Sequence, residues 1–131
     1  MKLGFSVLWV ALLAACAAVP CKAGGSAALE SRVEARWSVL ARGDLAAAYA
    51  YLSPAAREVT SFEKYAGGIK PGIWRSGTVD KVVCTTDDLC AVDVSVKYVF
   101  KPRNGPALEN TRVVNETWRQ VGGEWWFVPA D

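Results

Sequence analysis

Residues 90–100, CAVDVSVKYVF, alternate between apolar and polar side chains, and this stretch decides the class of fold. In an extended strand, successive side chains point to opposite faces. One face therefore carries the apolar or aromatic residues Cys90, Val92, Val94, Val96, Tyr98 and Phe100. The other face carries Asp93, Ser95 and Lys97. The alternation predicts a strand with one buried and one solvated face.

Three further strands are expected around this one, at residues 79–84, 111–121 and 124–128. Residues 101–110 contain two prolines, a glycine and two asparagines, which is typical of a loop. Gly122-Gly123 is typical of a tight hairpin turn between the last two strands. The second half of the chain therefore predicts an antiparallel sheet of about four strands.

The first half has helical periodicity instead. Leu29, Val33, Trp37 and Leu40 recur at intervals of three or four, which places them on one face of a helix, with Arg36 away from that face. A glycine at position 43 favours the end of this helix.

Three capping patterns predict short helices after it. Asp44 is a natural N-cap for residues 45–52. Ser53-Pro54 combines a capping hydroxyl with a proline suited to the first helical position. Residues 60–63, TSFE, match a capping box, and Gly67-Gly68 follows. Helices followed by an antiparallel sheet define an α+β fold.

The N-terminus has the pattern of an export signal. Met1-Lys2 is followed by an apolar, uncharged run over residues 3–15, shorter than the roughly 20 residues of a membrane-spanning helix. Residues 13–16, LAAC, resemble the lipobox of bacterial lipoproteins, in which the cysteine is lipidated and becomes the new N-terminus. The resemblance implies a signal peptide over residues 1–15, lipidation of Cys16, a tether over residues 16–28 and a folded domain over residues 29–131.

The location that follows is the cell envelope. Ala17 follows the cysteine, rather than the Asp that retains enteric lipoproteins at the inner membrane, which favours the outer membrane facing the periplasm. Cleavage after Ala23 would instead give a soluble periplasmic protein. The lipoprotein interpretation leaves Cys21 unpaired.

Composition excludes several classes of function. The 131 residues are 52% hydrophobic, with 15 Lys and Arg, 13 Asp and Glu, and no His. Without a basic block, nucleic acid is not an expected partner. The absence of His removes the commonest general base and metal ligand, so neither a metal nor a cofactor is expected.

The order of motifs resembles the nuclear-transport-factor-2-like superfamily. The resemblance is carried by residues 35–37 (ARW), 43–49 (GDLAAAY), 52–54 (LSP), 116–118 (ETW) and 123–126 (GEWW). It implies a curved sheet that forms a cone around a cavity. That superfamily includes isomerases, dehydratases, epoxide hydrolases and binding modules, so the fold alone does not define a function. The acid–base residues of its enzymes have no residue-by-residue match here.

Cysteine and aromatic residues supply most candidate sites. Cys84 and Cys90 would face each other across a hairpin and are expected to form a structural disulfide, with inert thiols or a redox or metal role as alternatives. The expected ligand-binding residues of the cavity are Trp37, Tyr49, Tyr98, Trp118 and Trp125. Trp74 and Trp126 are expected on a partner surface; Trp125 and Trp126 are adjacent and must point to opposite faces. Core packing is the alternative for every tryptophan.

Glu116 is the one weak catalytic candidate. If Trp118 faces the cavity, Glu116 does too, and a carboxylate there could act as a general acid or base. The alternatives are that Glu116 lies at the cone mouth in water, or that the opposite face of the strand, with Val113, Thr117 and Val121, is the buried one.

These observations favour a lipid-anchored, non-catalytic module that binds a small apolar ligand or an envelope protein partner. A homodimer that forms through the sheet face is a further alternative. The alternatives are a small isomerase or dehydratase using Glu116, and a domain that stacks cell-wall sugars on Trp74 or Trp126.

Overall fold

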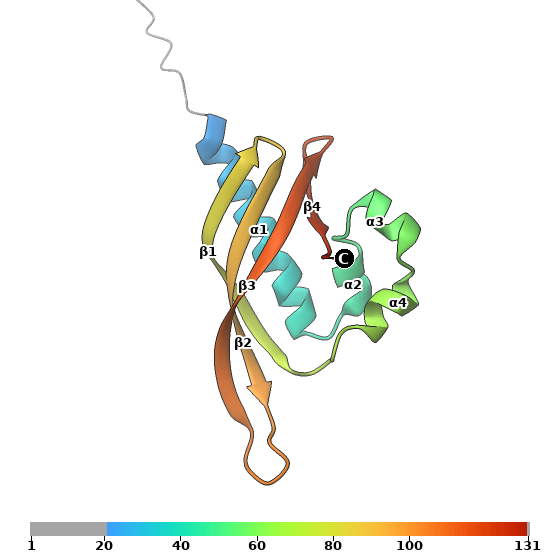
Figure 1. Cartoon of the computed structure of the whole chain (residues 1–131), viewed down its shortest axis with the longest axis vertical. Helices are drawn as coiled ribbons and strands as arrows, with labels where there is room; N and C mark the ends of the chain where they lie inside the picture. Colours follow the sequence, from blue (N-terminus) through green and yellow to red (C-terminus); the bar gives the residue numbers. More distant parts are fainter. Residues whose placement is uncertain (1–20, 131) are drawn as a thin grey trace, which may run out of the picture.

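The structure, a computed structural model, describes residues 21–130 and consists of helices followed by an antiparallel sheet (Figure 1). The helices are α1 (Cys21–Ala41), α2 (Leu45–Tyr49), α3 (Pro54–Val59) and α4 (Phe62–Gly67). The strands are β1 (Trp74–Thr86), β2 (Leu89–Phe100), β3 (Leu108–Val121) and β4 (Glu124–Val128). The predicted α+β fold, with helices packed on a four-stranded antiparallel sheet, is confirmed.

The sheet has the order β1-β2-β3-β4, with each strand antiparallel to the next. Figure 1 shows α1 across one face of the sheet, and α2, α3 and α4 grouped beside β4. Leu52 forms a parallel bridge to Phe127, so the chain between α2 and α3 covers the free edge of β4. The sheet remains open, because β1 has no partner on its other side among the described residues.

The core lies between α1 and the inner face of the sheet. The predicted alternation of β2 holds for Cys90, Val92, Val94 and Val96, which are all buried. They pack with residues of the α1 face and with tryptophans of β3 and β4: Leu29, Val33, Trp37, Val39, Leu40, Trp118 and Trp125.

Phe100 departs from the pattern of the strand to which it belongs. It was predicted on the buried face, but it is 55% exposed. The end of the β2–β3 hairpin extends past the helices in Figure 1, so no helix covers it there. Its cross-strand partner Leu108 is exposed for the same reason.

Local capping explains the short helices. The side chains of Asp44 and Ser53 each accept a hydrogen bond from the backbone N–H three residues on, as predicted for N-caps. The third cap is Ser61 rather than Thr60, so the capping box was placed one residue too early. Thr60 is the C-cap of α3 and has an extended backbone, so the N-cap of α4 is the next residue.

Several boundaries differ from their predicted positions, two of them because of pairing. The helix predicted to reach residue 52 ends at Tyr49, and the following residues pair with β4 instead. Strand β1 begins at Trp74 rather than at residue 79, since Trp74 pairs with Tyr98. Helix α1 begins at Cys21, within the segment predicted as a tether.

Candidate functional site

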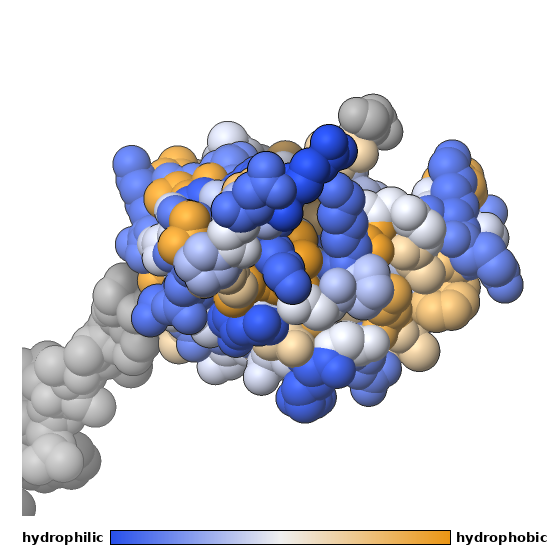
Figure 2. All heavy atoms as spheres, turned by 90° about the horizontal axis from the view of Figure 1, so that it is seen from below, coloured by the Kyte–Doolittle hydropathy of each residue, from blue (hydrophilic) through white to orange (hydrophobic). Residues whose placement is uncertain are grey.

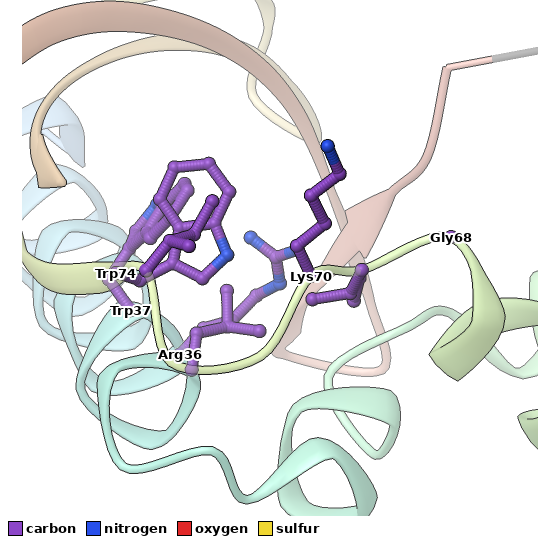
Figure 3. A pocket seen from close by; sticks show the side chains of 8 residues that line it. Arg36, Trp37, Gly68, Lys70 and Trp74 are labelled. Atoms are coloured by element: carbon purple, nitrogen blue, oxygen red, sulfur yellow. The ribbon is translucent and has the colours of Figure 1, made fainter. Parts of the chain in front are cut away.

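A pocket of about 340 Å³ opens between α1 and the segment that leads from α4 into β1 (Figure 3). Its size falls within the roughly 300–1,000 Å³ typical of small-molecule sites. The pocket is lined by Arg36, Trp37, Leu40, Gly68, Ile69, Lys70, Ile73 and Trp74. It therefore combines two indole rings and three aliphatic side chains with two cationic groups.

The two indole rings meet edge to face. The ring centroids of Trp37 and Trp74 are 5.5 Å apart, and the ring planes are inclined by 74°. Trp37 packs directly over Gly77 of β1, where a Cβ atom would lie 2.4 Å from the Trp37 Cγ. Only glycine leaves room for this ring, so Gly77 sets its position against β1. Trp74 also contacts Tyr98, with centroids 6.4 Å apart.

Arg36 links the pocket to the core. It is only 5% exposed, and its Nη1 donates to Glu116 Oε1 at 2.8 Å. Its guanidinium carbon lies 3.7 Å from the centroid of the Phe127 ring. Its Nε is buried without a hydrogen-bond partner, as is the indole Nε1 of Trp37.

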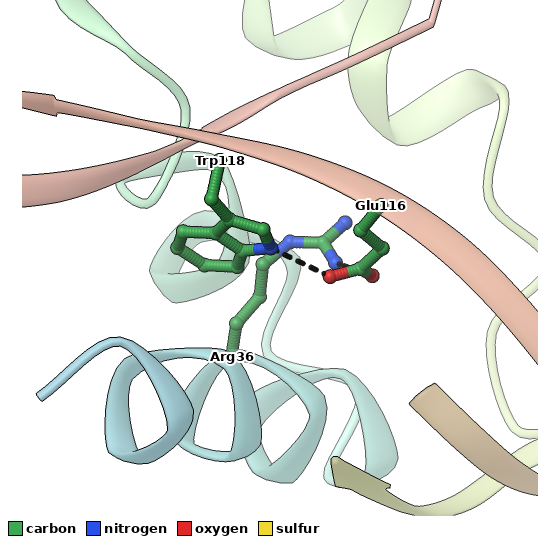
Figure 4. A network of polar contacts seen from close by, with 3 residues as sticks. All are labelled: Arg36, Glu116 and Trp118. Atoms are coloured by element: carbon green, nitrogen blue, oxygen red, sulfur yellow. Dashed lines mark hydrogen bonds and ion pairs between the residues drawn. The ribbon is translucent and has the colours of Figure 1, made fainter. Parts of the chain in front are cut away.

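Glu116 is held by two donors from different elements (Figure 4). Oε1 accepts from Arg36, and Oε2 accepts from the Trp118 Nε1 at 2.9 Å. The carboxylate is buried beside Trp118, as the strand alternation predicted, but Glu116 does not line the pocket. With one oxygen on each donor, this geometry orients Arg36 and Trp118 rather than presenting a base to a ligand.

The expected ligand-binding residues lie in three different places. Trp37 alone among them lines this pocket, and Tyr98 lies next to it, half-buried against Trp74. Trp118 and Trp125 are packed in the core, with exposed fractions of 0% and 5%. The Tyr49 hydroxyl donates to the Thr60 carbonyl at 2.7 Å and so joins α2 to the end of α3.

The two tryptophans expected on a partner surface lie in different places. Trp74 lines the pocket, because β1 begins earlier than its sequence indicated. Trp126 is half-buried, and the guanidinium carbons of Arg32 and Arg57 lie 5.2 and 5.6 Å from its ring. Because two cations lie beside this indole, less of its ring face is available for stacking against a sugar.

The outer face of the sheet combines polar pairs with the exposed side chains of Val83, Val113 and Val121. Ser95 donates to Asp80, and Asn115 donates to Asp93 at 2.7 Å. Apolar atoms lie in several places in Figure 2, including the helical side at its right. Helices α3 and α4 carry Val59, which is 80% exposed, and Phe62.

The cysteines differ in what the structure describes. Cys84 and Cys90 are directly opposed in the β1–β2 register and joined by a disulfide. Cys16 and the proposed signal peptide lie outside the described residues, and Cys21 is described only as the first residue of α1. In residues 21–130, no group of His, Cys, Asp or Glu could hold a metal ion.

Sequence reasoning missed Arg36 and Lys70. Arg36 was placed away from the buried helix face, yet it follows Val33 by three residues and precedes Leu40 by four. That spacing places Arg36 within a wider buried stripe of the helix, so the sequence did contain an indication that Arg36 is buried. Lys70 lies in an irregular segment where no periodicity applies.

Comparisons with known proteins bear on the fold only. No family model and no curated protein matches the chain. The solution structure of a SEC-C motif containing protein from Rhodopseudomonas palustris is similar, with a TM-score of 0.59 and 15% identity. The match covers 79% of this chain and 77% of that one. At this identity the likeness shows a shared fold, and the resemblance to the nuclear-transport-factor-2-like superfamily stays a prediction.

Proposed function

We propose that this chain is a non-catalytic binding module that takes a small, largely apolar molecule into the pocket between α1 and β1. The observation that carries the proposal is the pocket itself, whose wall contains Trp37 and Trp74. Concave sites with aromatic walls and a few polar groups are typical of small-molecule binding. Most of the remaining lining is aliphatic, from Leu40, Ile69 and Ile73.

The position of Glu116 supports binding over catalysis. An acid or base must come within hydrogen-bond reach of the substrate atom on which it acts. Glu116 does not line the pocket, and both of its oxygens already accept hydrogen bonds from protein donors. The ionisable side chains that do line the pocket are those of Arg36 and Lys70, and the guanidinium of Arg36 is suited to binding an anion rather than to proton transfer.

We further propose that the module is attached to the periplasmic side of the outer membrane through a lipid on Cys16. The support is the LAAC sequence at residues 13–16 after a short apolar run. None of the described helices is long and apolar enough to cross a membrane. The intact mass of the mature protein tests this proposal, because lipidation adds acyl chains to an N-terminal Cys16. A Cys16→Ser variant is expected to leave the membrane fraction; a chain that begins after Ala23 would contradict lipidation.

Native mass spectrometry of the protein isolated from its own envelope tests the binding function. The expected spectrum contains a small-molecule adduct that Trp74→Ala abolishes, because this substitution removes one wall of the pocket. Trp126→Ala is the matched control, since it removes an indole of the same size outside the pocket. An adduct that survives Trp74→Ala, or is lost equally in both variants, would overturn the pocket assignment. Cross-linking in cells tests the alternative, in which the module binds a protein partner.

A further inference from the structure

We infer that the molecule bound in this pocket carries a negative charge, in the form of a carboxylate attached to a flat, apolar ring. This inference rests on the proposed binding function and adds the chemical class of the ligand. Three features of the pocket support it: its charge, its unpaired donors and the shape of its apolar wall.

The charge of the pocket is one-sided. Of the eight lining residues, two are basic and none is acidic. Lys70 is exposed and has no ion-pair partner among the described residues. Figure 3 shows the Arg36 guanidinium between the tryptophan side chains and Lys70, so both cations lie on the same side of the rings. An anion placed there would be attracted by the Lys70 ammonium, whereas the charge of Arg36 is balanced by Glu116 and Arg36 offers its unpaired N–H donor.

Two buried donors at the pocket wall have no acceptor. The Arg36 Nε and the Trp37 Nε1 belong to consecutive residues of α1, and neither has a hydrogen-bond partner. Buried polar groups in folded proteins nearly always have partners, so two unpaired donors on residues that line one pocket point to a missing acceptor. Both groups donate only, and an anionic oxygen is a strong acceptor for such donors. Arg36 keeps its Nη1 on Glu116, so a ligand would not have to compete for that bond.

The apolar part of the ligand follows from the remaining wall. The Trp37 and Trp74 rings meet at a steep angle and form a corner, with Leu40, Ile69 and Ile73 in the rest of the lining. A planar ring can lie against one indole face and present its edge to the other, which are the arrangements that aromatic pairs prefer. The carboxylate would then lie toward Arg36 and Lys70.

A pair of matched probes tests the inference. The isotope-labelled full-length chain is titrated with 2-naphthoate and with the nearly isosteric, uncharged 2-naphthamide, while the tryptophan indole N–H signals are followed by nuclear magnetic resonance. We expect both probes to shift Trp37 and Trp74 more than Trp118, whose N–H is already bonded to Glu116. Naphthoate should bind about tenfold more tightly, because only it brings a charged acceptor.

Two lysine variants isolate the charge. Lys70→Gln is expected to weaken naphthoate binding about threefold, as for an exposed ion pair, and to leave naphthamide unchanged. Lys64→Gln is the matched control: this exposed lysine of α4 makes the same change in net charge without lining the pocket. It should leave the affinity for both probes unchanged.

The outcomes separate this inference from the function on which it rests. If neither probe shifts Trp37 or Trp74, the proposed binding pocket itself is overturned. If both probes bind there with equal affinity, or Lys70→Gln and Lys64→Gln behave alike, the anionic ligand is overturned and the apolar pocket stands.

Discussion

Replacement of Glu116 by Gln tests whether this carboxylate stabilises the fold or is free for chemistry. The change preserves side-chain size and one acceptor oxygen but removes the negative charge opposite Arg36. Both partners are nearly inaccessible, with side-chain exposures of 7% for Arg36 and 3% for Glu116. The guanidinium would then remain buried without a counter-charge.

The expected loss is large for a domain of this size. Removing one partner of a buried ion pair destabilises a protein by about 3–5 kcal/mol. Because Gln can still accept one hydrogen bond, we take the lower end, about 3 kcal/mol. With a urea dependence of roughly 2 kcal/mol per molar, the unfolding midpoint should fall by about 1.5 M. The measurement is urea unfolding of the full-length chain followed by circular dichroism and tryptophan fluorescence.

Two comparisons make the result specific to the pair. Glu109→Gln removes the same charge from an exposed position of β3 and should change stability by no more than about 0.5 kcal/mol. Adding Arg36→Met to Glu116→Gln removes the stranded cation and should recover part of the loss. A midpoint for Glu116→Gln within experimental error of the native chain would refute the structural role and reopen the catalytic one.

Three further perturbations test other parts of the structure. Gly77→Ala should destabilise the chain by about 1–3 kcal/mol in urea unfolding, because its Cβ would overlap the Trp37 ring. Replacing both Cys84 and Cys90 by Ser should lower the free energy of unfolding by about 2 kcal/mol, since the disulfide closes only a short loop. Asp44→Ala should cost about 1 kcal/mol by removing the cap of α2, measured in the same way.

Each of these three perturbations has a control. Gly67→Ala meets nothing within 4 Å in α4 and should be neutral or slightly stabilising, so equal losses at both glycines would contradict the packing argument. Alkylation of the unreduced chain followed by mass analysis counts free thiols; a chain in which Cys84 and Cys90 both react would contradict the disulfide. For the cap, Asp44→Asn retains the acceptor, and a loss as large as that of Ala would exclude the capping hydrogen bond.

The fold class followed from local patterns. Alternation in residues 90–100 predicted β2 and its buried face, and Gly122 and Gly123 adopt the positive φ angles of a two-residue hairpin turn. Asp44 and Ser53 capped the helices where their side chains can reach a neighbouring N–H. These features depend on atoms a few residues apart, so the sequence alone contains what determines them.

The candidate site depended on contacts between distant parts of the chain. Arg36 and Glu116 are 80 residues apart, and only the packing of α1 on the sheet brings a cation and a carboxylate together in the core. Trp74 became a pocket wall because pairing with Tyr98 extends β1, which the composition of that segment did not indicate. Periodicity reports which face a residue occupies but not what lies opposite it. The partners of Arg36, Glu116 and Trp74 were therefore decided by the tertiary structure.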